Sequence, residues 1–138
     1  MLEMKPEGLS SARARPRSPN IQNYRPQLTS VLSIANRITA LASTVAMVAF
    51  VAWLIAAELS PRAYEAMHTA AASPIGRALL VIATFAFFLH LCGSVRHLVW
   101  DSARGFELRA IYISGWVAVV ASVVLTAAAW VTGLLLKG

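Results

Sequence analysis

One histidine lies deep inside an apolar run of the sequence, and a group of polar residues follows it. His90 is followed by Arg96, His97 and Asp101 near the end of the same run. Moving an imidazole from water into hydrocarbon costs free energy unless a partner satisfies it. An ionisable residue inside a membrane span therefore indicates a functional site. We expect the chemistry of this protein around His90.

His90 has features of an axial ligand to haem b. His90 and His97 are seven residues apart, so both would lie on nearly the same face of a helix, about 10 Å apart along its axis. Gly93, one turn from His90, would leave room beside the imidazole for a flat macrocycle. Arginine or histidine nearer the surface would suit the propionates. The alternative is a histidine that hydrogen-bonds to a serine or a backbone carbonyl and binds no haem.

Further metal ligands are scarce in this sequence. His68 falls in a separate polar segment, and His97 shares the helix face of His90. A second axial ligand is therefore expected from another chain. The single cysteine, Cys92, has no CxxC or CxxCH partner, so structural zinc and covalent c-type haem attachment are unsupported.

A second polar group precedes the first apolar run. Ser30, Ser33 and Arg37 follow a spacing of three and four, which places two hydroxyls and a guanidinium on one helix stripe. Such donors could bind a quinone carbonyl and supply protons from the aqueous side. The alternative is helix capping by serine, together with an arginine that reaches the lipid headgroups.

The composition indicates an all-α membrane protein with one domain. Of the 138 residues, 58% are hydrophobic and 13% are charged, unlike a soluble globular protein of this size. Crossing a bilayer takes about 20 apolar residues. We expect transmembrane helices over about 30–57, 78–100 and 110–136, in a three-helix domain over 30–138. Between the first two helices, 58–77 is expected to be a short polar connection that carries Pro61, His68 and Pro74, with ends that are punctuated rather than periodic.

The charges predict the side of the membrane that each loop faces. The part of the chain through Arg37 holds six Lys or Arg and the second loop holds three, against two in the first loop and one at the C-terminus. By the positive-inside rule, the N-terminus and the second loop are cytoplasmic. The beginning of the first helix and the end of the second then share one face. The polar group of the first helix would therefore approach Arg96 and His97.

Residues 1–29 form an extended, basic, proline-rich tail. No apolar run follows its charges closely enough for a signal peptide, so we expect the tail to be retained. In a soluble chain the net charge of +6 would suggest nucleic acid. In this apolar chain no nucleic acid partner is expected, and attraction to anionic lipid headgroups is the simplest interpretation.

Small side chains recur every four residues in the third apolar run. Ser114, Ala118, Ser122 and Thr126 form a stripe that allows another helix backbone to come close. The stripe would pack against the chain's own helices or against a partner subunit. Since three helices leave much apolar surface uncovered, we expect a partner membrane subunit.

Two motifs carry a resemblance to a known family. RSPNIQNYRPQLTSVLSIANRIT covers residues 17–39, and HLCGSVRHLVWD covers residues 90–101. Together they resemble the cytochrome b membrane-anchor subunit of succinate dehydrogenase, respiratory complex II. The resemblance extends over the tail and all three apolar runs. Asn36 stands where the family usually has histidine, and Ala40 where it usually has glycine.

The resemblance implies two shared sites. It makes His90 the axial ligand of haem b, with the opposite ligand from a second membrane-anchor subunit. It places Arg96 and His97 near the haem propionates. It assigns contacts with ubiquinone to Ser33 and Arg37. The tail would pack under the iron–sulfur subunit, which works with a flavoprotein subunit that oxidises succinate.

The resemblance also implies a dependent role in the tricarboxylic acid cycle and respiratory electron transport. The chain has no flavin or iron–sulfur motif, so it is expected to be a subunit of succinate dehydrogenase that is not catalytic alone. Two alternatives stay open: a b-type cytochrome anchor of another quinone-linked dehydrogenase, and a haem-free structural anchor. The short N-terminus with Glu3 and Glu7 favours a bacterial inner membrane over a mitochondrial one.

Overall fold

The structure, a computed structural model, describes residues 25–137, which are almost entirely helical. The four helices are α1 (Leu28–Leu59), α2 (Pro61–Ala72), α3 (Pro74–Asp101) and α4 (Leu108–Lys137). This described part of the chain contains no strand. The expected all-α fold is confirmed. Most of the predicted tail, residues 1–24, lies outside the described residues.

Three of these helices are long and apolar enough to cross a membrane. α1, α3 and α4 have 32, 28 and 30 residues, and the best window of each has a mean hydropathy of 2.2. At a rise of 1.5 Å per residue even α3 is about 42 Å long, which exceeds a hydrocarbon core of about 30 Å. The expectation of a membrane protein with three helices of spanning length is confirmed.

A short helix, α2, occupies most of the segment expected to be a polar connection. The hydroxyl of Ser60 accepts a hydrogen bond from the backbone N–H of Ala63 at 3.3 Å, and Pro61 is the first helical residue. Serine satisfies a free N–H at a helix start, and proline fixes a helical φ. Ser73 begins α3 in the same way. The expectation for 58–77 is wrong on this point, because its prolines start helices.

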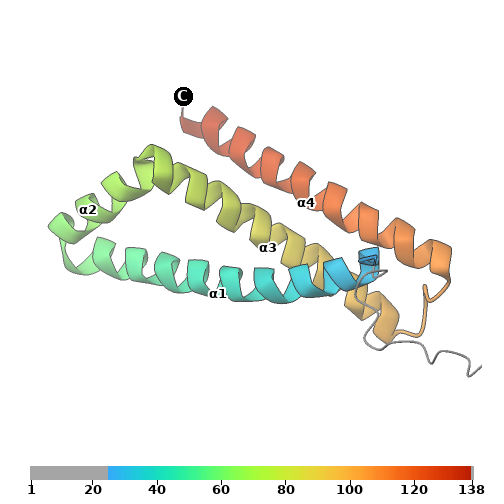
Figure 1. Cartoon of the computed structure of the whole chain (residues 1–138). Coiled ribbons are helices and arrows are strands. Elements are labelled where there is room, and N and C mark those ends of the chain that lie inside the picture. The colour runs from blue at the N-terminus through green and yellow to red at the C-terminus, as the bar shows by residue number, and fades with distance from the viewer. Residues whose placement is uncertain (1–24, 138) are drawn as a thin grey trace, which may run out of the picture.

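α3 is the central helix of the bundle (Figure 1). It packs against α1 on one side and α4 on the other, whereas α1 and α4 make much less contact with each other. α1 and α3 run antiparallel, and α2 joins them at one end. The beginning of α1, the end of α3 and the beginning of α4 therefore meet at the other end.

Small side chains of α4 are buried within the chain's own bundle. Ala118 is 7% exposed, Ser122 is fully buried and Thr126 is 8% exposed. The hydroxyls of Ser122 and Thr126 each donate to a backbone carbonyl of α4 at 2.7 Å. Their burial therefore leaves no hydroxyl proton unpaired, and the helices can pack closely. The predicted stripe serves packing inside this chain.

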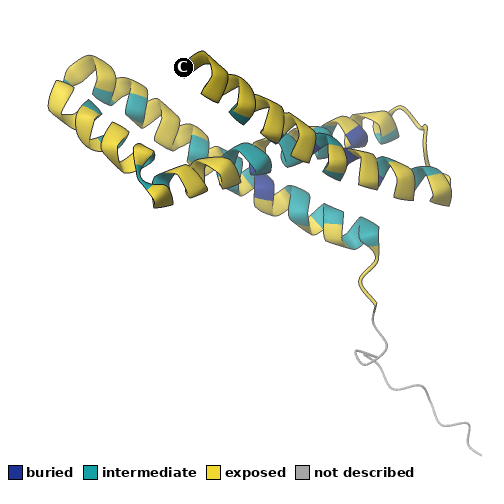
Figure 2. Cartoon of the chain, turned by 90° about the horizontal axis from the view of Figure 1, so that it is seen from above, coloured by how far each residue is buried: buried dark blue, intermediate teal, exposed yellow. Residues whose placement is uncertain are grey.

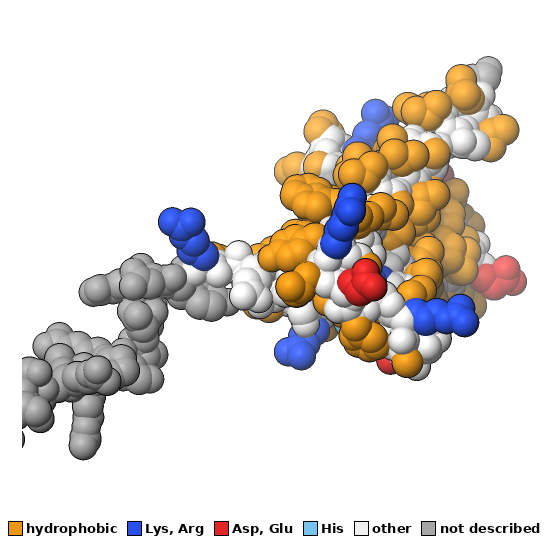
Figure 3. All heavy atoms as spheres, turned by 90° about the vertical axis from the view of Figure 1, so that its right-hand side faces the viewer, with side chains coloured by type: hydrophobic (Ala, Val, Ile, Leu, Met, Phe, Trp, Pro, Cys, Tyr) orange, Lys and Arg blue, Asp and Glu red, His pale blue; other side chains and the backbone are white. Residues whose placement is uncertain are grey.

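Most of the remaining surface is apolar. Large hydrophobic side chains are exposed along α1, α3 and α4, and buried positions are confined to the places where helices cross (Figure 2). Figure 3 shows the end of the bundle where α1 begins, with charged side chains around it and hydrophobic side chains along the flanks. This distribution suits lipid or another membrane subunit around the flanks and water at the end.

Candidate functional site

The backbone of α1 holds the ring of His90. The Nδ1 atom of His90 lies 3.2 Å from the backbone carbonyl oxygen of Asn36. A carbonyl oxygen can only accept, so Nδ1 carries the proton and donates it, and Nε2 keeps a free lone pair. His90 is half-buried inside the apolar α3. A backbone hydrogen bond was the expected alternative to haem ligation, but this bond uses only one of the two ring nitrogens.

The space beside Gly93 is filled by the side chain of Asn36. A Cβ placed on Gly93 would collide with Oδ1 of Asn36 and would lie 3.1 Å from its Cγ. Gly93 thus allows α1 and α3 to approach closely, and a carboxamide takes the room that was expected there for a macrocycle. Oδ1 of Asn36 is buried and has no hydrogen-bond partner among the described residues.

Arg96 joins α3 to α4. Its Nε donates to the hydroxyl of Ser114 at 3.1 Å, and its Nη2 donates to the backbone carbonyl of Ile111 at 3.1 Å. The guanidinium also lies over the ring of Trp100, 4.0 Å from the ring centroid. The side chain is only 9% exposed. Because a guanidinium has five N–H donors, part of its donor capacity is still free for another acceptor.

A pocket of about 460 Å³ opens between the beginning of α1 and the end of α3. This mouth pocket is lined by Thr29, Ser30, Ser33, Ile34, Arg96, His97 and Trp100. The structure therefore brings Ser33 together with Arg96 and His97, which are more than 60 residues away in sequence. Arg37, one turn further along α1, is exposed and does not line the pocket.

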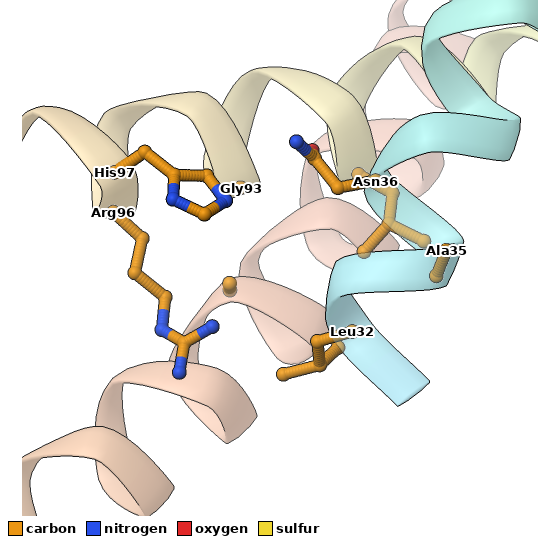
Figure 4. Close-up of a pocket in the computed structure, with 8 residues that line it drawn as sticks. Leu32, Ala35, Asn36, Gly93, Arg96 and His97 are labelled. Carbon is orange, nitrogen blue, oxygen red and sulfur yellow. The ribbon is translucent and has the colours of Figure 1, made fainter. Parts of the chain in front are cut away.

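A small cavity of about 20 Å³ lies beside the mouth pocket. Arg96 and His97 line both spaces, and Leu32, Ala35 and Asn36 close the cavity from α1 (Figure 4). Its volume is enough for about one water molecule. Asn36, whose backbone carbonyl holds His90, therefore lies on the wall of a cavity that shares Arg96 and His97 with the mouth pocket.

Trp100 belongs to this site, although it is not among the site residues expected from the sequence. Its ring meets the ring of His97 edge to face at 5.3 Å and stacks with Phe106 at 6.5 Å. Together with the guanidinium of Arg96 on its face, it restricts both polar residues of the pocket wall. Trp100 follows His97 by three residues and Arg96 by four, a spacing that predicts contact between their side chains on one helix face.

The hydrogen bond of His90 fits a role as haem ligand, although Asn36 takes the room expected beside Gly93. Histidines that bind metals commonly donate the other ring N–H to a backbone carbonyl, which fixes the tautomer and raises the basicity of the ligand. Among residues 25–137 no group of three or more His, Cys, Asp or Glu could bind a metal ion by itself, but a haem iron needs only axial ligands from the protein. His68 lies in α2, where its ring packs on Tyr64 at 5.8 Å.

Comparison with known proteins identifies the family. Residues 11–129 match the family described as the succinate dehydrogenase/fumarate reductase transmembrane subunit. The chain is 39% identical over 117 residues to the succinate dehydrogenase cytochrome b556 subunit of Rickettsia conorii. The aligned region covers 85% of this chain and 91% of the relative. The chain is 35% identical over 111 residues to the subunit of the same name from Paracoccus denitrificans, with 80% and 85% covered.

A relative with a different name matches a similar share of the chain at lower identity. The succinate dehydrogenase cytochrome b560 subunit of Reclinomonas americana is 30% identical over 122 residues, with 85% of each chain covered. The resemblance carried by residues 17–39 and 90–101 is thereby confirmed. This chain belongs to the family of succinate dehydrogenase/fumarate reductase transmembrane subunits.

Proposed function

We propose that this chain is a membrane-anchor subunit of a succinate:ubiquinone oxidoreductase, that it binds haem b together with a partner, and that it helps to form the quinone-reduction site. Its partners are a flavoprotein subunit, an iron–sulfur subunit and a second membrane-anchor subunit. Family membership supports the assembly. The hydrogen bond from Nδ1 of His90 to Asn36 is the observation that carries the haem proposal.

His90 would hold the haem iron through Nε2, because its Nδ1 is already engaged by α1. Haem b supplies one-electron transfer when it is bound. The opposite ligand would come from the second membrane-anchor subunit. Arg96 and His97 are proposed to bind the propionates, which is supported by the free N–H donors of the Arg96 guanidinium and by the exposed ring of His97.

The mouth pocket is the proposed site of quinone reduction. Its volume of about 460 Å³ suits a quinone headgroup. The Ser33 hydroxyl can donate to a quinone carbonyl oxygen, and Ser30 lies one turn earlier on the same helix. Reduction to the quinol takes two electrons and two protons, and the hydroxyls at this mouth can pass protons to the carbonyl oxygens. Arg37 is exposed one turn beyond Ser33 and does not line the mouth pocket, so its proposed role as a second quinone contact rests on the family resemblance alone.

The proposed location is a bacterial inner membrane, with the N-terminus and the mouth pocket on the cytoplasmic side. The relatives from Rickettsia and Paracoccus support a bacterial membrane, and the distribution of Lys and Arg supports the orientation. In this orientation the tail would meet the iron–sulfur subunit.

The test uses the complex purified from membranes through a tag on this chain. A subunit that oxidises succinate should copurify, and the reduced-minus-oxidised spectrum should contain a b-type band. Absence of the oxidising subunit would reject the assembly, and absence of the band would reject haem binding and leave a structural anchor.

Two histidine variants make the ligand test specific. His90→Ala should abolish or strongly shift the band, because the iron loses its ligand from this chain. The matched control is His68→Ala, which removes an exposed imidazole in α2 and should leave the band unchanged. An unchanged band in His90→Ala would reject the ligand role.

A further inference from the structure

We infer that Asn36 is a positioning residue for His90, and that its contact with Gly93 fixes the register of α1 and α3 in which the His90 ring is held. This inference rests on the proposed function, because it assigns to Asn36 a role in the properties of the haem that His90 would bind. Two features of the same asparagine carry it. Its backbone carbonyl holds the imidazole, and its carboxamide fits against Gly93.

The hydrogen bond joins two helices that are distant in sequence. Asn36 and His90 are 54 residues apart. Among the described residues, this contact is the one side-chain hydrogen bond that links α1 with α3. The hydrogen bond that restrains the His90 ring and selects its tautomer therefore depends on the relative position of the two helices.

The bond is sensitive to small movements of the helices. A shift of one residue along a helix is about 1.5 Å of translation and about 100° of rotation. Either change would break a contact of 3.2 Å between Nδ1 of His90 and the Asn36 carbonyl. Something must therefore hold α1 and α3 in one register.

The Asn36–Gly93 contact supplies that restraint. Gly93 lies one turn after His90 on nearly the same face of α3. The carboxamide of Asn36 occupies the space of the missing Gly93 side chain, with its own Cβ 3.8 Å from where a Gly93 Cβ would be. One residue of α1 thus contacts two successive turns of α3, which limits both sliding and rotation.

The register has a consequence for redox chemistry. Donation from Nδ1–H to a carbonyl makes the imidazole a more basic ligand. A more basic axial ligand stabilises oxidised iron and lowers the reduction potential. Loss of the Asn36 contact should therefore shift the haem midpoint potential upward, an effect that general loosening of the bundle far from His90 would not produce.

The first test compares the haem potential of two glycine substitutions in the purified complex. Gly93→Ala places a methyl group on Oδ1 of Asn36, so we expect an upward shift of the haem potential. The matched control is Gly133→Ala, because nothing lies within 4 Å of a Cβ at that position, and its potential should equal that of the wild type. Equal potentials for Gly93→Ala and the wild type would overturn the inference.

A second variant covers the case in which Gly93→Ala disturbs assembly. Asn36→Ala removes the carboxamide but keeps the backbone carbonyl, so we expect a smaller upward shift. In the double variant Asn36→Ala with Gly93→Ala, the added methyl group no longer meets a carboxamide, and the haem potential should return toward that of Asn36→Ala. A double variant whose haem potential equals that of Gly93→Ala alone would contradict the role of this contact.

A cross-link tests the register without using haem. With Cys92 replaced by alanine, cysteines at positions 36 and 93 would have their Cβ atoms about 3.8 Å apart, which suits a disulfide. Mild oxidation of the complex should protect both thiols from a maleimide reagent. The control pair, Arg37→Cys with Gly93→Cys, should stay reactive. If the Asn36→Cys and Gly93→Cys pair forms no disulfide and stays reactive to maleimide, the inference is overturned.

The outcomes separate this inference from the function on which it rests. A wild-type complex without a b-type band rejects the haem proposal, and the cross-link then decides the register alone. If the b-type band is normal and neither Asn36→Ala nor Gly93→Ala changes the haem midpoint potential, the positioning role is rejected and the haem proposal stands.

Discussion

The Nε of Arg96 donates to the hydroxyl of Ser114 at 3.1 Å and so joins the end of α3 to the beginning of α4. The same guanidinium donates to the Ile111 carbonyl and lies over the Trp100 ring. Arg96 therefore braces two helices while it lines the mouth pocket. Arg96 is proposed to bind a haem propionate, and the structure also gives it a role in packing α3 against α4.

Replacing Arg96 by lysine should weaken the contact between α3 and α4. An ammonium cannot reproduce the planar fork that meets Ser114 and Ile111 together. In a double-mutant cycle with Ser114→Ala, we expect a coupling free energy of about 1 kcal/mol. Thermal unfolding of the purified complex measures it. The control is Arg104→Lys, in the exposed loop. A coupling free energy of zero between Arg96→Lys and Ser114→Ala would contradict the role of Arg96 in joining α3 to α4.

Enlarging Ser122 should separate α4 from its neighbours. Ser122 is fully buried in the small-residue stripe, so leucine at this position has no space. We expect Ser122→Leu to lower the free energy of unfolding by about 1–3 kcal/mol, which would appear as a lower melting temperature or a lower yield of assembled complex. Val123→Leu changes an exposed neighbour and should behave as the wild type. Equal stability of the two variants would argue against the packing.

Removing the hydroxyl of Ser33 should weaken quinone reduction without loss of assembly. One lost hydrogen bond of about 1 kcal/mol corresponds to roughly a fivefold fall in kcat/KM for the quinone. Arg37→Ala should also lower succinate–quinone activity, with assembly intact. Thr44→Ala and Arg62→Ala remove an exposed hydroxyl and an exposed cation elsewhere and serve as controls. Normal activity in both Ser33→Ala and Arg37→Ala would reject these assignments.

The cavity beside the mouth pocket should hold one ordered water. Oδ1 of Asn36 is a buried acceptor, and Arg96 and His97 on the cavity wall both carry N–H groups. A buried polar atom usually finds a partner, and about 20 Å³ is enough for one water. A density map of the complex that resolves ordered waters checks this expectation. Asn36→Leu should remove the water, and an empty cavity in the wild type would contradict the prediction.

The N-terminus should face the cytoplasm. In a chain whose Cys92 is replaced by alanine, Ser102→Cys lies in the loop between α3 and α4, and Thr69→Cys lies in α2; both positions are exposed. In intact cells a membrane-impermeant maleimide should label the cysteine at 69 and spare the one at 102. Permeabilised cells are the control, because both cysteines should react there. The reverse labelling pattern would invert the proposed topology.

Sequence alone was sufficient for the class of this protein. Uncharged runs of about 20 residues or more have few alternatives to membrane helices, so the three long helices and the family could be predicted from local pattern and motif. The stripe of Ser114, Ala118, Ser122 and Thr126 follows from helical periodicity in the same way. Pro61 and Pro74 were expected to punctuate the polar connection, but with Ser60 and Ser73 they mark the starts of α2 and α3.

Tertiary structure decided which groups meet between helices. The partner of the His90 ring is a backbone carbonyl, an atom that every residue carries and that no sequence pattern marks. The space at Gly93 was foreseen, but its occupant is Asn36 of another helix. Arg96 turns toward Ser114, and Arg37 stays outside the mouth pocket. Periodicity fixes the face of a helix on which a residue lies, whereas contacts between helices depend on crossing and register, which only packing of the whole chain determines.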